Sequence, residues 1–432
     1  MALLIANNPV LTNMMNMVKI ISKLLFFPMA FFIASSSLAW AAPVEVYRGV
    51  LGSADVVMEL GESQADGTRK GRYFYLRHGA DIPLRGRLDQ LAEAQPLTGE
   101  LLEKRLHATT QDEPLFEDAA RRQVIWHARL QGDALTGEWE DGIRGSRLPF
   151  SLGRVAQYDP EKLAPRGVEA VTLAIAQGAG SGIAEGIAIS MQATPYDYLR
   201  VARPLEQGEE VVVASNLAWR LVRDARTRFW YPRLTRHPDA RMLAVANALL
   251  EQRHWTMSLQ ALACKAAIYK SLDPEAGSLG YFDHEQIKLS YLSTTLMSVT
   301  ESGSPSCGGA HPNNHFDPFT LDLLHGGYLD FSRLIKGYSH GSEGRDYSPQ
   351  LVRFIRKAVT SRREPRDDDD CTDMLPDFMA LMFEAPGKLG FVVSRIGHAR
   401  SVCLGRGVSL SFGKLKSILK PEATRYLFPL DR

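Results

Sequence analysis

The chain has little excess charge and few cysteines. Its 432 residues contain 50 Lys and Arg against 49 Asp and Glu, which gives a formal net charge of +1. Nucleic-acid-binding domains usually concentrate positive charge in a patch or stripe, so this composition argues against a nucleic-acid partner. The chain has 4 cysteines and no Cys-x-x-Cys pair. This spacing argues against zinc-ribbon and thioredoxin-like redox sites.

The common catalytic motifs are also missing. No Gly-x-Ser-x-Gly nucleophile elbow is present, and the glycine-rich run at 178–182 lacks the Lys-Ser/Thr of a phosphate-binding loop. His284 and Glu285 begin a His-Glu-x-x-His pattern, but Lys288 stands where the second histidine is needed. Paired carboxylates leave no sequence pattern, so general acid–base catalysis stays open. No positive feature indicates an enzyme, and no cofactor is predicted.

The N-terminus has the pattern of a secretory signal peptide. Lys19 and Lys23 precede an apolar run at 24–33, and Ala39-Trp40-Ala41 matches an A-x-A cleavage site. We therefore predict a signal peptide over 1–41 and a periplasmic or secreted mature chain. The start codon can be Met1 or Met17.

Beyond this segment the sequence predicts no membrane span. The most apolar later stretch, 168–191, contains Glu169, Glu185 and several glycines, and a lipid-facing helix tolerates ionised side chains poorly. An even number of cysteines in an oxidising compartment is compatible with two disulfides, for which three pairings exist. Pairing neighbours in sequence closes the shorter loops and is preferred: Cys264 with Cys307, and Cys371 with Cys403.

Residues 42–155 read as an all-β module. Five β-rich runs are separated by glycine-bearing breaks, at 45–50, 55–60, 72–76, 124–128 and 148–152. In the run at 72–76 both faces are largely apolar, which suits a small sandwich or barrel better than a sheet with one solvated face. Residues 156–167, which include two prolines, are a linker candidate.

Residues 168–432 read as an α+β domain with an antiparallel sheet. Strands are expected at 168–176 and 186–191, and a helix over about 239–255 from apolar residues at helical spacing. The run at 285–300 alternates as one long strand, and Phe319-Thr320-Leu321-Asp322-Leu323 is expected to return as its partner. Two last strands are expected at 389–393 and 407–412.

The connection between these two runs concentrates histidine, glycine and asparagine. Gly308 and Gly309 give backbone freedom at a bend and Asn313 tolerates left-handed geometry, so the stretch predicts a decorated strand-to-strand corner. The candidate binding residues are Gly308, Gly309, Ala310, His311, Asn313 and Phe316. The alternative is a metal site made by His311, His315 and Asp317, as zinc would require. The main expectation is that the corner holds no metal.

Two family resemblances accompany this pattern. The β-rich half is similar to an uncharacterised β module of exported bacterial proteins, through a strand of type Gly-x-Tyr-Phe-Tyr and a later Leu-x-Gly-x-Trp. Residues 217–420 resemble the PdaC/RsiV-like extracytoplasmic domain family. The matching segments are Tyr231-Pro232-Arg233-Leu234, a helix bearing Asn247, the long strand to Thr300, Gly308-Gly309-Ala310-His311, Thr320-Leu321-Asp322-Leu323 and Leu410-Ser411-Phe412-Gly413-Lys414-Leu415.

This second family includes the lysozyme-binding sensor of an anti-sigma factor and the non-catalytic domain of a peptidoglycan deacetylase. The resemblance implies recognition within the cell envelope. The four cysteines and an Asp-rich insertion depart from the family pattern, so the ligand need not carry over. We therefore expect a soluble periplasmic binding protein that has no membrane span after cleavage and whose partner is a protein or glycan. The alternative is a metal-dependent envelope hydrolase.

Overall fold

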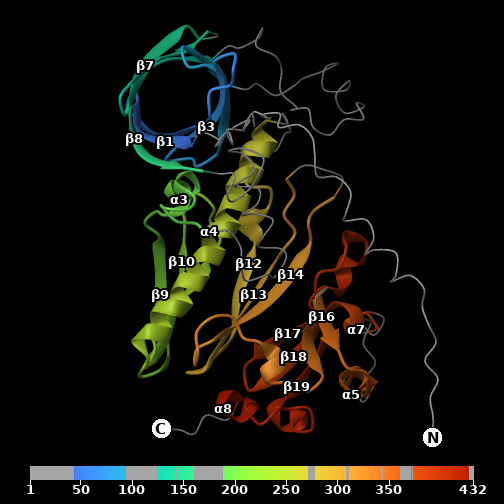
Figure 1. The fold of residues 1–432 in the computed structure, drawn as a ribbon. Coiled ribbons are helices and arrows are strands. Elements are labelled where there is room, and N and C mark those ends of the chain that lie inside the picture. Colours follow the sequence, from blue (N-terminus) through green and yellow to red (C-terminus); the bar gives the residue numbers. More distant parts are fainter. Residues whose placement is uncertain are drawn as a thin grey trace, which may run out of the picture. The chain divides into compact units, whose positions relative to one another are not determined.

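The computed structural model (Figure 1) divides into Met1–Trp40 and Ala41–Arg432. The residues that it describes are 43–93, 124–142, 144–159, 188–270, 278–307, 311–341, 344–360, 371 and 373–427. The predicted signal peptide lies outside them. No helix in the described ranges is long and apolar enough to cross a membrane.

The N-terminal β module is a closed barrel of eight antiparallel strands. In sequence order they are β1 (Val44–Leu51), β2 (Ala54–Leu60), β3 (Thr68–Tyr75), β4 (Ile82–Arg87), β5 (Gln90–Glu93), β6 (Val124–Gln131), β7 (Ala134–Asp141) and β8 (Ser146–Tyr158). Each strand pairs with its sequence neighbours, and β1 also pairs with β8 to close the ring. The predicted β module is confirmed. Of the two architectures expected for it, a small sandwich or a barrel, the structure has the barrel.

Aromatic side chains fill the barrel interior. The ring centroid of Trp126 lies 4.9 Å from that of Tyr73 and 4.8 Å from that of Phe150, and all three side chains are buried. The strands approach closely at Gly49, where an added Cβ would lie 2.1 Å from the Ser151 carbonyl oxygen. A small barrel of this kind packs its centre with its own side chains.

The predicted linker at 156–167 begins too early, because β8 continues to Tyr158 and pairs there with Val44. Residues 160–187 lie outside the described ranges, and with them the predicted strand at 168–176. The strand predicted at 186–191 is wrong over its described part, since 188–191 are coil, bend and turn. This segment leads into the short helix α3 (Pro195–Val201).

A buried ionic cluster joins the barrel to α3. The Arg72 guanidinium lies 2.7 Å from Glu59, 3.3 Å from Asp81 and 3.6 Å from Asp197, and Arg200 reaches the same Asp81 at 2.9 Å. Burial raises the pKa of the Glu59 carboxyl, and the neighbouring Arg72 opposes the shift. Pairing of this kind is what permits charges to remain inside a protein.

The C-terminal part contains four small antiparallel sheets and few helices. The sheets are β11 (Tyr231–Arg236), β10 (Leu217–Arg223) and β9 (Glu206–Ala214); β12 (Gln286–Leu292), β13 (Leu296–Gly303) and β14 (His315–Asp322); β15 (Tyr338–Gly341) and β16 (Gly344–Tyr347); β17 (Met379–Glu384), β18 (Lys388–Val393) and β19 (Gly407–Ser411). The main helices are α4 (Ala240–Lys270) and α5 (Pro349–Thr360), with the short α7 (Leu375–Phe378) and α8 (Ala423–Leu427).

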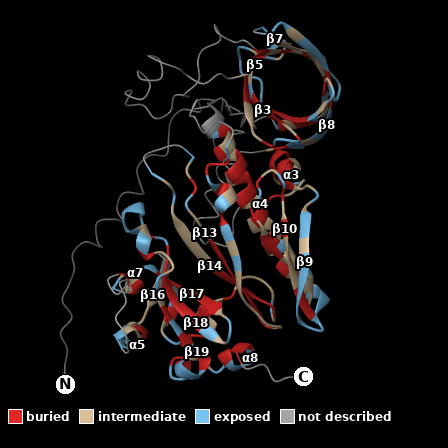
Figure 2. Cartoon of the chain, turned by 180° about the vertical axis from the view of Figure 1, so that it is seen from behind, coloured by how far each residue is buried: buried red, intermediate tan, exposed pale blue. Residues whose placement is uncertain are grey.

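The central strand β13 is covered on both faces. Met297 and Val299 pack into one core with residues of α4, whereas Leu296 on the opposite face belongs to the core that β17 and β18 complete. On that second face the Ser298 hydroxyl accepts a hydrogen bond from the backbone N–H of Phe383 in β17. Figure 2 shows the resulting buried residues in these elements.

Three expectations for this half need correction. The run at 285–300 is a hairpin, because the Ser293 hydroxyl accepts backbone N–H groups from Thr295 and Leu296 and turns the chain. The predicted helix at 239–255 continues without a break to Lys270. The α+β description holds in part, since one antiparallel sheet was expected and four small ones are found. Strands β9 and β17 and helix α5 were not predicted.

Candidate functional site

The predicted corner joins β13 to β14, and hydrogen bonds fix both of its ends. Gly303, the last residue of β13, pairs with His315, the first residue of β14. Next to this pair the Ser304 hydroxyl donates to the Asn314 side chain, with 2.6 Å between Oγ and Oδ1. Residues 304–314 therefore leave and re-enter the sheet at one place, as expected for a corner between partner strands.

His315 lies between two carboxylates. Its Nε2 is 2.8 Å from Glu285 Oε2, and its Nδ1 is 3.1 Å from Asp317 Oδ2. Glu285 follows the 3-10 helix η3 (Phe282–His284), and Asp317 lies on β14. The Glu285 side chain is fully buried, while 20% of the His315 side chain is exposed. Both ring nitrogens of His315 thus face an acceptor oxygen.

This geometry makes His315 a cation at neutral pH. Burial by itself lowers the pKa of the imidazole, but the hydrogen bonds and charges of Asp317 and Glu285 outweigh it and raise that pKa to about 10. An imidazolium donates from both nitrogens and has no lone pair for a metal ion or for a substrate proton. His315 is therefore suited to holding the strand ends together or to attracting negative charge.

The Glu285 carboxylate fits because residue 303 is glycine. A Cβ added to Gly303 would lie 1.9 Å from Glu285 Oε1, well inside van der Waals contact. Oε1 accepts no hydrogen bond from the described residues, although it is buried. The carboxylate is thus held by His315 on one side and by the backbone of β13 on the other.

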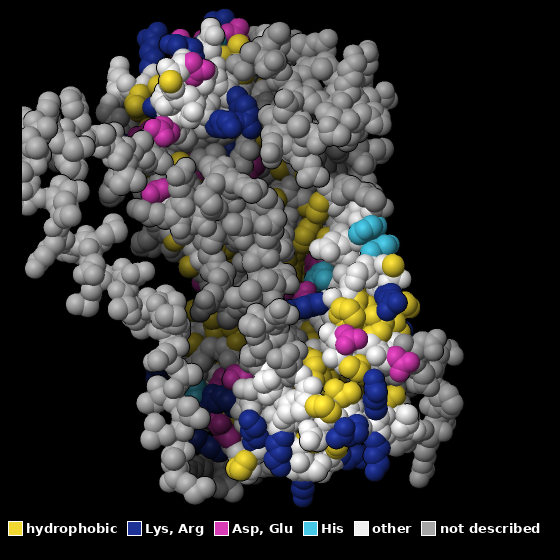
Figure 3. Space-filling model, turned by 45° about the vertical axis from the view of Figure 1, so that its right-hand side comes forward, with side chains coloured by type: hydrophobic (Ala, Val, Ile, Leu, Met, Phe, Trp, Pro, Cys, Tyr) yellow, Lys and Arg dark blue, Asp and Glu magenta, His cyan; other side chains and the backbone are white. Residues whose placement is uncertain are grey.

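The exposed part of the corner carries a pair of stacked histidines. The rings of His311 and His398 lie 4.4 Å apart and are inclined by only 5°. Asn314 Nδ2 donates to His398 Nδ1 over 2.6 Å, and His311 Nδ1 lies 3.0 Å from the Pro312 carbonyl oxygen. Figure 3 shows histidine side chains gathered on one face beside hydrophobic ones. We call His311, Asn313, Asn314 and His398 the corner surface.

Two disulfides hold the segments that form the corner surface. Cys307 in the corner is bonded to Cys264 of α4, with 4.8 Å between the Cα atoms. Cys403 ends the 3-10 segment η5 (His398–Cys403) that supplies His398, and it is bonded to Cys371, with 5.2 Å between the Cα atoms. Both predicted pairings are confirmed. A cross-link limits the conformations of the segment that it closes, so the corner surface is covalently constrained from both sides.

The other predicted binding residues divide into three groups. Gly308, Gly309 and Ala310 lie outside the described residues. His311 and Asn313 are exposed, as a binding role requires. Phe316 instead packs against a small core of β17 and β18, and the Ser394 hydroxyl donates to its carbonyl oxygen over 2.6 Å.

The structure does not assemble the alternative metal site. His315 and Asp317 are adjacent, but the ring of His311 stacks on His398 instead. Within the described ranges, no group of three His, Cys, Asp or Glu side chains could hold a metal ion. His315 also has both nitrogens directed at carboxylates, which leaves no ligand atom for a metal.

Sequence reasoning missed two members of this cluster. Glu285 was considered only as part of a zinc-protease pattern, and His398 was not considered at all. They lie 30 residues from His315 and 84 residues from Asn314, respectively. Neither residue belongs to a recognisable motif. The one available signal was that Glu285 begins the alternating run at 285–300, which was expected to pair with the strand that became β14.

Asp322, at the end of the Thr320-Leu321-Asp322-Leu323 motif, forms a separate buried cluster. Its Oδ1 accepts the backbone N–H groups of Leu324 and His325, and its Oδ2 accepts the Tyr426 hydroxyl over 2.7 Å and lies 3.3 Å from Arg333. Asp322 accepts the backbone N–H groups of the turn after β14 and connects this turn to Tyr426 of α8. We therefore assign this aspartate a structural role.

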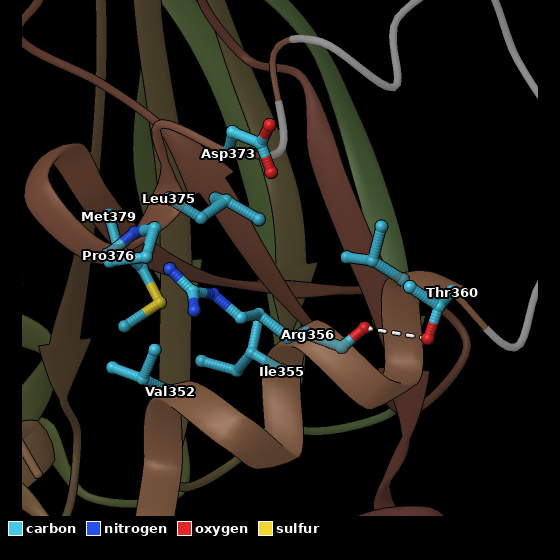
Figure 4. A pocket seen from close by; sticks show the side chains of 9 residues that line it. Val352, Ile355, Arg356, Thr360, Asp373, Leu375, Pro376 and Met379 are labelled. Carbon is cyan, nitrogen blue, oxygen red and sulfur yellow. Dashed lines mark hydrogen bonds between the residues drawn. The ribbon is translucent and has the colours of Figure 1, made fainter. Parts of the chain in front are cut away.

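A mostly apolar cavity of about 140 Å³ lies between α5 and α7 (Figure 4). Its charged lining residues are Arg356 and Asp373, and Val352, Ile355 and Leu375 supply much of the remainder. No imidazole or thiol lines it. The cavity is suited to an apolar side chain and offers no group of residues for catalysis, so the corner surface remains the stronger candidate.

Comparison with known proteins gives no further guide: no protein-family model matches the chain, and no curated protein matches it.

Proposed function

We propose that this chain is an exported protein of the cell envelope that recognises a protein or glycan through the corner surface. The observation that carries the proposal is the exposed stack of His311 on His398, presented by two segments that are each anchored by a disulfide. A preorganised surface loses little conformational entropy on binding. Exposed imidazole and amide groups supply both hydrogen bonds and flat faces for a partner.

The chemistry of the cluster favours binding over catalysis. Glu285 and Asp317 bind both ring nitrogens of the cationic His315 at the base of the corner, so this imidazole has no lone pair with which to act as a base. The two disulfides fit the oxidising compartment that the predicted signal peptide implies. The resemblance to the PdaC/RsiV-like domain supports the same kind of role, with a lysozyme-like protein or peptidoglycan as the first partners to try.

A binding assay with matched variants tests this proposal. The purified protein, His311→Ala/Asn313→Ala and the control His78→Ala, an exposed histidine of the barrel, are each immobilised. They are exposed to an envelope extract, purified peptidoglycan and a lysozyme-like protein. We expect at least one partner to be retained by the protein and by His78→Ala and lost from the double variant.

Equal recovery of every partner by all three proteins would rule out the corner surface as the binding site. The hydrolase alternative is tested separately by elemental analysis of the purified protein. We expect no stoichiometric zinc or other transition metal; one bound ion per chain would restore that alternative.

A further inference from the structure

The cavity between α5 and α7 has a buried apolar floor and an exposed rim. Ile355, Leu375 and Met379 form the floor and are 3%, 2% and 3% exposed. These three residues belong to the core that β17 and β18 complete. Two other lining residues, Arg356 and Asp373, are exposed to solvent. The cavity is therefore a pocket that opens from the hydrophobic core to the surface.

The pocket has room for one apolar group. Its volume of about 140 Å³ is close to that of an engineered core cavity of about 150 Å³ that stays dry and binds benzene. Val352, Val359 and Pro376 complete its lining, so the walls are apolar as well as the floor. A leucine or phenylalanine side chain is of this size, whereas a sugar or a hydrated ion would find no polar partner on the floor.

Two opposite charges stand at the rim of the pocket. Within the described ranges, neither the Arg356 guanidinium nor the Asp373 carboxylate forms an ion pair or a side-chain hydrogen bond. Figure 4 shows the Arg356 side chain extending toward Pro376 and Met379, with Asp373 on the other side of Leu375. A cation and an anion on either side of an apolar pocket are complementary to a ligand that carries both charges and an apolar group between them.

The neighbouring segment of the chain does not supply that apolar group. Residues 361–370, which lie outside the described residues, have the sequence Ser-Arg-Arg-Glu-Pro-Arg-Asp-Asp-Asp-Asp and contain no leucine, isoleucine, valine, methionine or aromatic residue. Directly after them Cys371 is bonded to Cys403, and this cross-link restrains the segment that carries Asp373 two residues later. The pocket therefore combines a fixed rim with a floor that suits an occupant from outside this segment.

We propose that this pocket binds a dipeptide with free termini and an apolar side chain, such as leucyl-leucine. Asp373 accepts hydrogen bonds from the ammonium group, Arg356 donates to the carboxylate, and the apolar side chain enters the pocket. The separation of the two charges by Leu375 favours a dipeptide over a single amino acid, whose ammonium and carboxylate groups share one carbon atom. This inference does not depend on the corner surface.

Titration calorimetry with four ligands provides the first test. We expect saturable binding of leucyl-leucine to the purified protein. Its N-acetyl derivative lacks the ammonium group and its C-terminal amide lacks the carboxylate, so each should bind about fivefold more weakly. Glycyl-glycine keeps both charges without the apolar group and should show no measurable binding.

Matched variants assign the two charges. Arg356→Gln should weaken the binding of leucyl-leucine about fivefold and leave the affinity for its C-terminal amide unchanged, because that ligand has no carboxylate. Asp373→Asn should likewise weaken leucyl-leucine and leave the affinity for the N-acetyl derivative unchanged. The controls Arg353→Gln and Asp377→Asn neutralise exposed charges of α5 and α7 that do not line the pocket, and they should leave every affinity unchanged.

Methyl NMR locates the ligand. Leucyl-leucine should shift the methyl signals of Ile355 and Met379 on the floor of the pocket and leave that of Met242, a buried residue of α4, unchanged. The absence of saturable binding would show that the cavity is a packing gap only and would overturn the inference. Shifts confined to other methyl groups would also overturn it, as would binding of leucyl-leucine that Arg356→Gln and Asp373→Asn leave intact.

Discussion

The barrel has no open strand edge, whereas the sheet that carries β9 ends in one among the described strands. In the barrel, β1 pairs with both β2 and β8, so every strand has two neighbours. In the sheet, β9 has one neighbour among the described strands and is exposed throughout. Closure satisfies all inter-strand backbone groups without a partner, whereas an open edge can pair with another chain. The barrel therefore satisfies its own strand edges, whereas the outer edge of β9 has no partner among the described strands.

The same contrast applies to charged groups. Arg72 and its carboxylate partners at the barrel–α3 junction are almost fully buried and satisfy one another, whereas the histidines of the corner surface are exposed and are fixed by disulfides nearby. A buried ion pair mainly holds elements in one arrangement. An exposed, constrained group remains available to a partner.

Breaking the junction should have the largest effect. Arg72→Ala leaves Glu59 buried without its cation and leaves Asp197 with Arg200 alone, and the loss of one partner from a buried pair costs about 3–5 kcal/mol. Urea denaturation of the variant should show this fall in the free energy of unfolding. Arg147→Ala, which removes a cation that is 59% exposed and paired with Glu140, should change stability by less than about 1 kcal/mol; equal effects would contradict the assignment.

Removing a disulfide should have the next largest effect and should be confined to the C-terminal part. Cys264→Ser/Cys307→Ser opens a link between residues 43 apart, and the loss of such a cross-link costs about 2–4 kcal/mol. Amide hydrogen exchange should accelerate in 304–314. The barrel strands serve as the internal control, and faster exchange there by the same factor would refute a local role.

Adding a methyl group at residue 303 should lower stability less than removing the disulfide, but it acts directly on the cluster of His315, Glu285 and Asp317. Gly303→Ala forces the Glu285 carboxylate to move, because the added Cβ would otherwise lie 1.9 Å from Oε1, and overpacking of this kind costs about 1–3 kcal/mol. NMR titration should show the pKa of His315 falling from about 10. The control Gly413→Ala, with no atom within 4 Å of the added Cβ, should leave that pKa unchanged.

The pH dependence of stability should report on His315 alone. The pKa of His315 is raised from 6.5 to about 10 in the folded protein, so the folded state holds a proton that the unfolded state releases. The resulting stabilisation is complete below about pH 6.5 and is lost as the pH rises through about 10. His315→Gln should flatten the fall in unfolding free energy over that interval; an unchanged slope would show that another group causes it.

Local patterns predicted much of the barrel. The longer runs in β1, β2, β3, β6 and β8 combine β-branched and aromatic residues, and they were assigned as strands from those residues alone. The short strands β4 and β5 and the glycine-containing β7 were not. In β4, Arg85 and Gly86 interrupt the apolar pattern, and the strand is defined by its pairing with β3 and β5 instead.

The candidate site was predictable only in outline. The corner, its partner strand and the Cys264–Cys307 pairing follow from glycine content, alternation and loop length. The positions of His315 between Glu285 and Asp317, and of His311 on His398, do not, because the partners are supplied by segments distant in sequence. The alternative metal triad was chosen from residues near one another in sequence; the fold keeps His315 beside Asp317 but stacks His311 on His398.

The sequence by itself determined the strand-rich first half and the glycine-bent corner, because each depends on residues close together in the chain. The tertiary structure decided that the eight strands close into a ring, that His315 lies between two carboxylates, and which of the three possible cysteine pairings forms. These properties depend on which distant segments come into contact, and local preferences carry no information about such contacts.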